Sequence, residues 1–142
     1  MDIRIKSSLY KEKELLQDLL DALDVQYSLL TVKNEDKDIV AICSIAEKID
    51  SIAKSIAIIE IERRKIISNE DLISQIENSD DSDSKNLLKD ISKVKRLVDN
   101  QNEINNTFVK QNLFFTKKML KIITPSENFN TYNNLGKLGL SK

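Results

Sequence analysis

The residues whose types and spacing best suit a chemical task are amides in the stretch from Lys85 to Ile123. Gln101, Asn105 and Asn112 stand at positions where a helix of this kind normally carries Leu or Ile. A buried amide without partners costs about 1–3 kcal/mol. The cluster therefore predicts a seam that is partly hydrated, or one that awaits a polar partner. An alternative is that an amide fixes the alignment of helices, for which one Asn would suffice.

Large apolar side chains accompany the amides and favour a binding face. Phe108, Phe114, Phe115 and Met119 lie within three turns of them, and such side chains are typical anchors at protein interfaces. The predicted binding residues are Val98, Gln101, Asn105, Phe108, Asn112, Phe115 and Met119.

The composition argues against catalysis, which needs a positioned acid, base, nucleophile or metal. The sequence contains no His, a single Cys and no Gly-rich loop that could hold a phosphate. Cys43 follows the apolar position Ile42 and is predicted to be a small residue of the core. We therefore expect no enzymatic activity, no catalytic or metal-binding residues and no cofactor.

The hydrophobic pattern indicates a protein of the cytoplasm. The unbroken apolar runs are short, such as the four residues from Ile56 to Ile59, and they are far too short to span a membrane. The first ten residues lack the apolar core of a secretory signal. We expect no membrane insertion.

A coiled-coil seam positions the amides and rings, because its gaps alternate between four and three residues. The seam consists of Leu87, Ile91, Val94, Val98, Gln101, Asn105, Phe108, Asn112, Phe115, Met119 and Ile122. No Pro or Gly interrupts it, so the sequence predicts a helix over residues 85–123, roughly 58 Å long. A helix of this length lies beside other long helices rather than around a globular core.

Two further seams precede it. The first predicts a helix over about 7–31, capped by Ser7 or Ser8, and the second a helix over about 35–67, with Asn34 in the turn between them. A short helix over 70–77 follows, and then a flexible acidic linker over 78–84. The seam positions are Leu9, Leu16, Leu20, Leu23, Tyr27 and Leu30 in the first helix, and Ile42, Ile45, Ile49, Ile52, Ile56, Ile59, Arg63 and Ile66 in the second.

The fold class that these elements predict is all-α. We expect an elongated antiparallel three-helix coiled-coil bundle over residues 1–124, with one short extra helix. Pro125 ends the long helix, because the residue before a proline disfavours helix. Residues 125–142 are predicted to form a flexible C-terminal tail, either idle or a docking peptide anchored by Tyr132.

Charge is unevenly distributed along the chain. Residues 1–84 hold 11 basic and 19 acidic residues, a net charge of −8, whereas residues 85–124 hold 9 and 3, a net charge of +6. One interpretation is that an acidic hairpin receives a basic helix. The other is a nucleic-acid surface along Lys85, Lys89, Lys93 and Arg96, which is disfavoured because no base-stacking aromatic residue lies among them. We expect no nucleic-acid partner.

The sequence resembles the FlgN family of flagellar export chaperones over nearly its whole length. The likeness includes a Leu-rich first helix and a second helix that ends in Glu62-Arg63-Arg64. It is strongest in the last third, where the order of residues is Asn102, Asn105, Asn106, Phe114-Phe115, Met119-Leu120, Thr131-Tyr132 and Gly136. The sequence departs from the family pattern at Asn133, where Gly is usual, and at Phe108, where Leu is common.

The resemblance implies a chaperone of type III export. Such proteins hold the hook-associated proteins of the hook–filament junction in an unassembled state and deliver them to the export gate. It implies that a terminal helical segment of the client binds the long helix, and that Tyr132 helps to dock the loaded chaperone on the cytoplasmic part of the gate, with the export ATPase complex as a further partner. The alternative is a structural coiled coil that self-associates through the same seam without binding a client. The sequence leaves open which client is preferred, and whether Arg63 pairs inside the bundle or lines the client groove.

Overall fold

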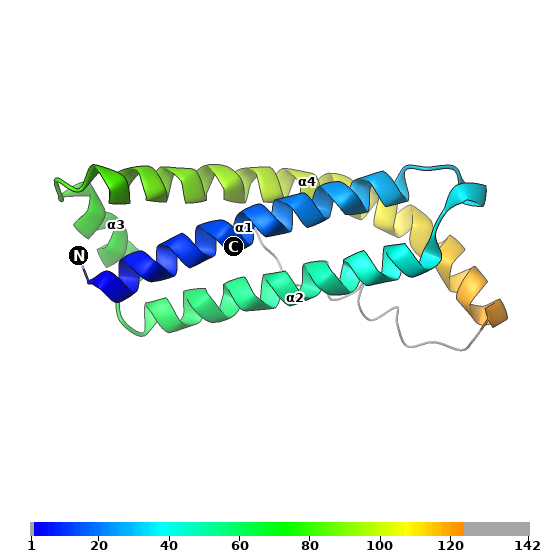
Figure 1. The fold of residues 1–142 in the computed structure, drawn as a ribbon, viewed down its shortest axis with the longest axis horizontal. Coiled ribbons are helices and arrows are strands. Elements are labelled where there is room, and N and C mark those ends of the chain that lie inside the picture. The colour runs from blue at the N-terminus through cyan, green and yellow to red at the C-terminus, as the bar shows by residue number, and fades with distance from the viewer. Residues whose placement is uncertain (1, 124–142) are drawn as a thin grey trace.

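The computed structural model describes the backbone of residues 2–123 and the side chains of residues 2–111. Within these limits the chain contains four α-helices, one 3₁₀ turn and no strand. The helices are α1 (Ile3–Leu30), α2 (Ile39–Arg64), α3 (Asn69–Glu77) and α4 (Ser82–Ile123), and the 3₁₀ turn η1 (Asn34–Asp36) joins α1 to α2. Figure 1 shows an elongated arrangement of three long helices, and the predicted all-α helical bundle is confirmed.

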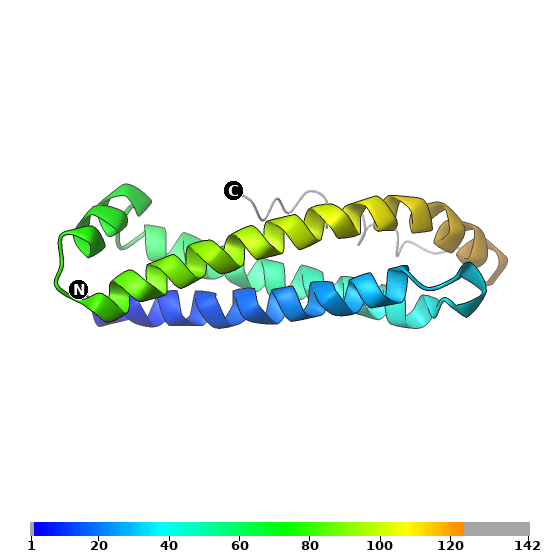
Figure 2. The ribbon, with the colours of Figure 1, turned by 90° about the horizontal axis from the view of Figure 1, so that it is seen from above.

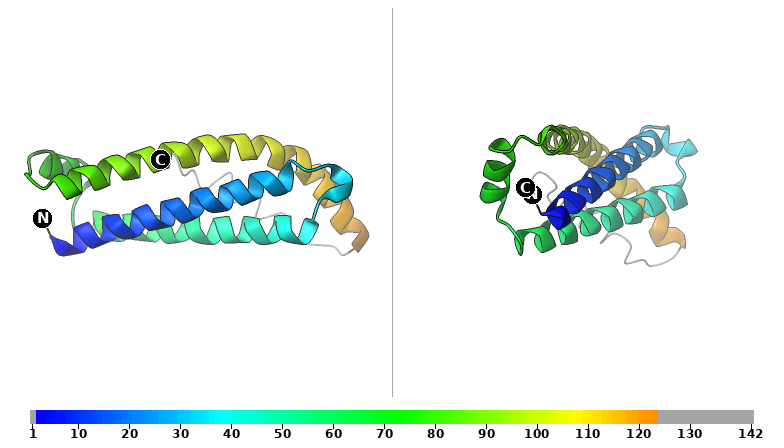
Figure 3. Two further views of the ribbon diagram at one scale, coloured as in Figure 1. Left: turned by 45° about the horizontal axis from the view of Figure 1, so that its top comes forward. Right: turned by 60° about the vertical axis from the view of Figure 1, so that its left-hand side comes forward.

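α1 is the central helix. It packs against both α2 and α4, whereas α2 and α4 contact each other only sparsely. α1 and α4 run in the same direction and α2 runs in the opposite one (Figures 1 and 2). Figure 3 shows α3 lying across one end of the bundle, between the end of α2 and the start of α4. α1 therefore carries the apolar surface that both other long helices need, which explains why Leu15, Leu19 and Ala22 form a second apolar stripe beside its seam.

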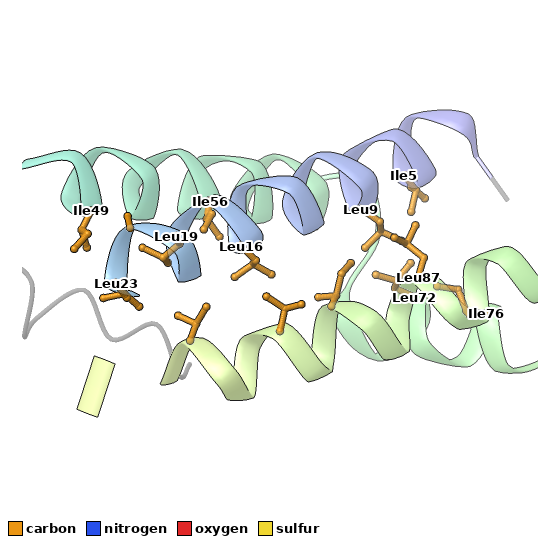
Figure 4. Packing of buried hydrophobic residues seen from close by; sticks show 14 of the residues in the cluster. Ile5, Leu9, Leu16, Leu19, Leu23, Ile49, Ile56, Leu72, Ile76 and Leu87 are labelled. Atoms are coloured by element: carbon orange, nitrogen blue, oxygen red, sulfur yellow. The ribbon is translucent and has the colours of Figure 1, made fainter. Parts of the chain in front are cut away.

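The core follows seven-residue spacings in all three long helices, as coiled-coil packing requires. Leu9, Leu16 and Leu23 of α1 belong to one buried cluster with Ile49 and Ile56 of α2 and with Leu87, Ile91, Val94 and Val98 of α4. Figure 4 shows Leu72 and Ile76 of α3 closing the end of this cluster beside Leu9 and Leu87. A second, smaller cluster at the other end contains Leu30, Ile42, Ala46 and Val109.

The helices begin and end at different residues from those predicted. α1 starts at Ile3 rather than near Ser7, because the Asp2 carboxylate accepts a hydrogen bond from the Arg4 N–H at 2.8 Å and caps the helix. α2 starts at Ile39 rather than at residue 35, because Asp38 caps it through the Ala41 N–H at 3.0 Å. α2 also ends at Arg64 rather than at residue 67.

The predicted linker over residues 78–84 is too long, because only residues 78–81 lie between α3 and α4. α4 already begins at Ser82, and Asp81 caps it by accepting hydrogen bonds from the Ser84 N–H at 3.3 Å and the Ser84 hydroxyl at 2.7 Å. Asp81 also forms an ion pair with Lys6 of α1 at 3.0 Å. The acidic run therefore contains a helix cap that fixes the start of α4 to α1, which its composition alone did not reveal.

Candidate functional site

The first half of α4 supplies core rather than open surface. Val98 is 1% exposed and belongs to the main buried cluster, together with the apolar positions that precede it in the seam. In this structure Val98 is sealed by its own chain, and its predicted role as a binding residue would require α4 to separate from α1.

Asn105 is fully buried and all its hydrogen-bonding groups are used within the chain. Its Nδ2 group donates to the Leu23 carbonyl at 2.8 Å and to Gln26 Oε1 at 3.0 Å, and its Oδ1 accepts from Gln101 Nε2 at 2.9 Å. Gln101 is half-buried. These two seam amides therefore hydrogen-bond to each other and to α1, whereas Gln26 Nε2 has no hydrogen-bond partner in the described part of the chain. Bonds of this kind are what the alternative role, alignment of the helices, requires. We name Gln26, Gln101 and Asn105 the amide layer.

A second polar layer crosses the bundle nearer α3. Glu12 of α1 is fully buried. One of its carboxylate oxygens lies 2.6 Å from a guanidinium nitrogen of Arg63 in α2, and the other lies 3.1 Å from Lys95 Nζ in α4. Neither approach has the angles of a hydrogen bond, so charge attraction holds the Glu12 carboxylate. Arg63 also donates to the Ser8 hydroxyl at 3.2 Å, and Lys95 lies 3.7 Å from Glu60. Arg63 is therefore paired inside the bundle; we name this group the charged layer.

Sequence reasoning missed Glu12 and Gln26, although a signal for both was present. Leu15, Leu19 and Ala22 form the second apolar stripe of α1, and the same alternation of three and four residues extends to Glu12 on one side and to Gln26 on the other. Both positions are fully buried. The stripe marks the burial of both positions, but spacing alone does not distinguish a buried polar side chain from an exposed one.

An aromatic pair lies near the end of the α1–α4 contact. Phe108 is half-buried and meets Tyr27 edge to face, with ring centroids 5.7 Å apart and planes at 88°. Leu97 and Ile104 precede Phe108 on the same flank of α4, and they are 43% and 47% exposed. This flank is the apolar surface of α4 that the bundle leaves open to solvent.

α4 continues well beyond its partner helix. Tyr27 lies beside Phe108, and α1 ends three residues later at Leu30, whereas α4 continues for fifteen residues after Phe108, about 22 Å of helix. We name residues 112–123 of α4 the overhang. In Figure 1 this last part of α4 leaves the line of the bundle. α1 ends at Leu30, so the overhang extends past the end of the helix that packs against the first half of α4.

The remaining predicted site residues lie at the limits of the structure. Asn112, Phe115 and Met119 belong to the overhang, but their side chains lie outside the described residues. Tyr132 lies outside them altogether. The structure therefore groups Gln101, Asn105 and Phe108 at one level of the bundle and leaves the others as sequence-based predictions.

Asp81, directly before α4, and Asp99 within α4 have shifted pKa values. Hydrogen bonds from Ser84 and then from Lys6 hold the pKa of Asp81 well below its ordinary value of 3.8. Partial burial raises the pKa of Asp99, with Lys95 acting weakly in the opposite direction. Asp81 serves as a helix cap and Asp99 is half-buried on α4, so capping and burial account for the two pKa shifts.

Residues 2–111 contain no group of His, Cys, Asp and Glu side chains that could hold a metal ion. Over the described helices, no segment is long and apolar enough to cross a membrane.

Comparison with known protein families identifies a match. The family model described as FlgN protein matches residues 1–139. No curated protein and no solved structure gives a significant match.

Proposed function

Because this chain belongs to the FlgN family, a family of flagellar export chaperones, we propose that it binds the hook-associated proteins of the hook–filament junction in the cytoplasm. It keeps them from assembling prematurely and delivers them to the type III export gate. The family is not one of enzymes, which agrees with the absence of His from the sequence.

The overhang is the observation that carries this proposal. α4 has 42 residues and α1 has 28, and the two run in parallel from the same end of the bundle. A helix that outruns its partner can accept a segment of another protein in the place of that partner. The open flank of Leu97, Ile104 and Phe108 leads along α4 towards the overhang.

We assign the client contacts by distance from the sealed core. Phe108, Asn112, Phe115 and Met119 would meet the client directly, with the aromatic rings and Met119 as apolar anchors. Gln101 lies at the edge of this surface. Val98 and Asn105 would support the surface from beneath, because both are buried against α1.

The affinity has an upper limit set by client folding. A client segment that becomes helical on binding loses conformational entropy, which consumes about 2–5 kcal/mol of the contact energy. This leaves a complex that protects the client but can still release it. Tyr132 and the tail would then dock the loaded chaperone on the cytoplasmic part of the gate and on the export ATPase complex.

Co-purification with the two hook-associated junction proteins tests this function. We expect at least one of them to form a stable complex with the full chain. Deletion of the terminal helical segment of that junction protein should abolish the complex. Failure of both junction proteins to bind, with the chaperone folded by circular dichroism, would overturn the proposal.

A further inference from the structure

The outer surface of the first half of α4 carries a row of basic side chains. The row consists of Lys85, Lys89, Lys93 and Arg96, and it extends over about 16 Å of helix. Lys85 is half-buried and the other three are exposed. We name these four residues the basic stripe.

The basic stripe lies on the face of α4 that points away from α1. Lys89 stands two residues after the buried Leu87 and two residues before the buried Ile91, and Arg96 stands in the same relation to the next two buried residues of the seam. Two residues correspond to about 200° around an α-helix, so side chains at such positions project on the side opposite the core. In Figure 1 the first half of α4 forms one long edge of the bundle and α2 forms the opposite edge.

The charge of the basic stripe is not neutralised by the rest of the bundle. None of its four side chains forms an ion pair in the described part of the chain, whereas the neighbouring Lys95 is paired with Glu12. Asn86, Ser92 and Asn100, which lie beside the stripe, are exposed and uncharged. The interpretation that an acidic hairpin receives a basic helix therefore does not account for these four charges.

A straight row of unpaired cations on a convex surface suits a flat anionic partner. We propose that the basic stripe binds the anionic headgroups of a lipid bilayer, with the first half of α4 lying along the membrane surface. Each Lys or Arg held near such a surface raises the affinity roughly five-fold. Four of them together are enough to retain the protein on an anionic membrane at low ionic strength.

Nucleic acid, the other common polyanion, fits the basic stripe less well. Proteins that bind single strands combine a basic groove with aromatic rings on which the bases stack. The stripe lies on the outer surface of one helix, and Phe108, the aromatic residue among residues 82–111, packs against Tyr27 instead. A flexible strand would also meet the acidic residues 1–84, which carry a net charge of −8, whereas a flat membrane meets one edge of the bundle.

Membrane contact through the basic stripe leaves the proposed client surface accessible. In Figure 1 the overhang bends away from the edge that the first half of α4 forms, towards the side on which α2 lies, and Figure 3 shows the same direction. Lipid binding by the stripe requires no client, so its failure and the failure of the proposed function can be told apart.

Co-sedimentation of the full chain with lipid vesicles, in the absence of a client, tests the proposal. One set of vesicles contains phosphatidylglycerol and phosphatidylethanolamine, and the other contains phosphatidylcholine alone. We expect binding to the anionic vesicles only. Binding should be lost as the salt concentration rises from about 50 mM to about 500 mM, because salt screens exposed charges.

Variants of the basic stripe identify the surface that binds. Lys89→Gln combined with Lys93→Gln should weaken binding to the anionic vesicles about 30-fold, since each lysine contributes roughly five-fold. The matched control, Lys11→Gln combined with Lys48→Gln, removes the same charge from exposed positions of α1 and α2 and should bind like the unaltered chain. Lys89→Arg combined with Lys93→Arg keeps the charge and should retain binding. Circular dichroism verifies that each variant is folded.

Three results would overturn the proposal. The first is the absence of binding to anionic vesicles at low salt, and the second is equal binding to both kinds of vesicle. The third is an equal effect of the stripe variant and the control variant. Binding of a single-stranded RNA oligonucleotide that Lys89→Gln with Lys93→Gln abolishes, without any binding to vesicles, would assign the basic stripe to nucleic acid instead.

Discussion

Glu12 and Arg63 form an ion pair of 2.6 Å in which both side chains are closed to solvent, at 0% and 6% exposure. Lys95 joins them from α4 at 3.1 Å and is 35% exposed. The charged layer thus connects three helices, two of which hardly touch otherwise. Isolated buried charges are costly, so each member depends on the others.

Glu12→Leu should strongly destabilise the bundle, because it leaves Arg63 buried without a counter-charge. The expected loss in the free energy of unfolding is about 3–5 kcal/mol, measured by urea denaturation. The triple variant Glu12→Leu, Arg63→Met, Lys95→Met should recover most of that stability, because it removes every buried charge. Equal instability of the single and triple variants would show that shape, and not charge, makes the layer important.

Asn105→Ala should cost about 1–3 kcal/mol of unfolding free energy, because it leaves the buried Gln26 amide and the Leu23 carbonyl without their shared donor. Thermal and urea denaturation measure the change, and Asn100→Ala at an exposed position of α4 is the control. If both variants are equally stable, the amide layer does not contribute to alignment of α1 and α4.

Phe115→Asp should weaken client binding with little effect on the bundle, since the substitution falls in the overhang. Removing a central anchor typically costs 2 kcal/mol or more, about a 30-fold rise in Kd, which titration calorimetry with a hook-associated protein would measure. Ile58→Asp, on the 56% exposed outer surface of α2, is the matched control. Unchanged affinity and normal flagellar assembly in Phe115→Asp would remove the overhang as the client site.

Tyr132→Ala should leave client affinity unchanged and weaken docking on the cytoplasmic part of the export gate. The two functions separate because Tyr132 lies outside the helical bundle in sequence. Pull-down with the gate domain and with the client, in parallel, gives both values. Equal loss of the two activities would assign the tail a structural role.

Asp81 should make stability depend on pH in the acidic range. Its folded pKa lies below the ordinary value of 3.8, so the carboxylate stabilises the fold above pH 3.8 and this contribution is lost as the pH falls through the lower folded value. Asp81→Asn should therefore lower the urea midpoint at pH 7, and the difference from the unaltered chain should shrink below pH 3.8. The neighbouring Asp80→Asn, which is exposed, should show no such difference. A difference for Asp81→Asn that stays constant down to pH 2 would contradict the assignment.

Periodicity predicted the elements of the fold but not the chemistry inside them. The seam from Leu87 to Val98 is buried as expected, because three- and four-residue gaps place apolar side chains on one face whatever the partner is. The predicted first residues of α1 and α2 lie several residues from the observed ones. Asp2 and Asp38 cap these helix starts through local hydrogen bonds, in competition with other nearby residues that could act as caps.

The polar layers could not be predicted, because they depend on which side chains meet across helices. Glu12 resembles any surface acid until Arg63 and Lys95 are placed beside it. Asn105 resembles an open binding residue until Gln26 is found within 3.0 Å. The spacing of residues along one helix does not indicate which residues of the other helices will contact them.

The parallel course of α1 and α4 has a consequence for biosynthesis. Lys6 meets Asp81 and Leu23 meets Asn105, so these contacts join residues 75 and 82 positions apart. The ribosome releases α1 and α2 first, and their hairpin closes through short-range contacts. One side of α1 then stays uncovered until α4 has been translated, which takes on the order of seconds at 5–20 residues per second. The newborn hairpin is thus the form of this protein most exposed to aggregation.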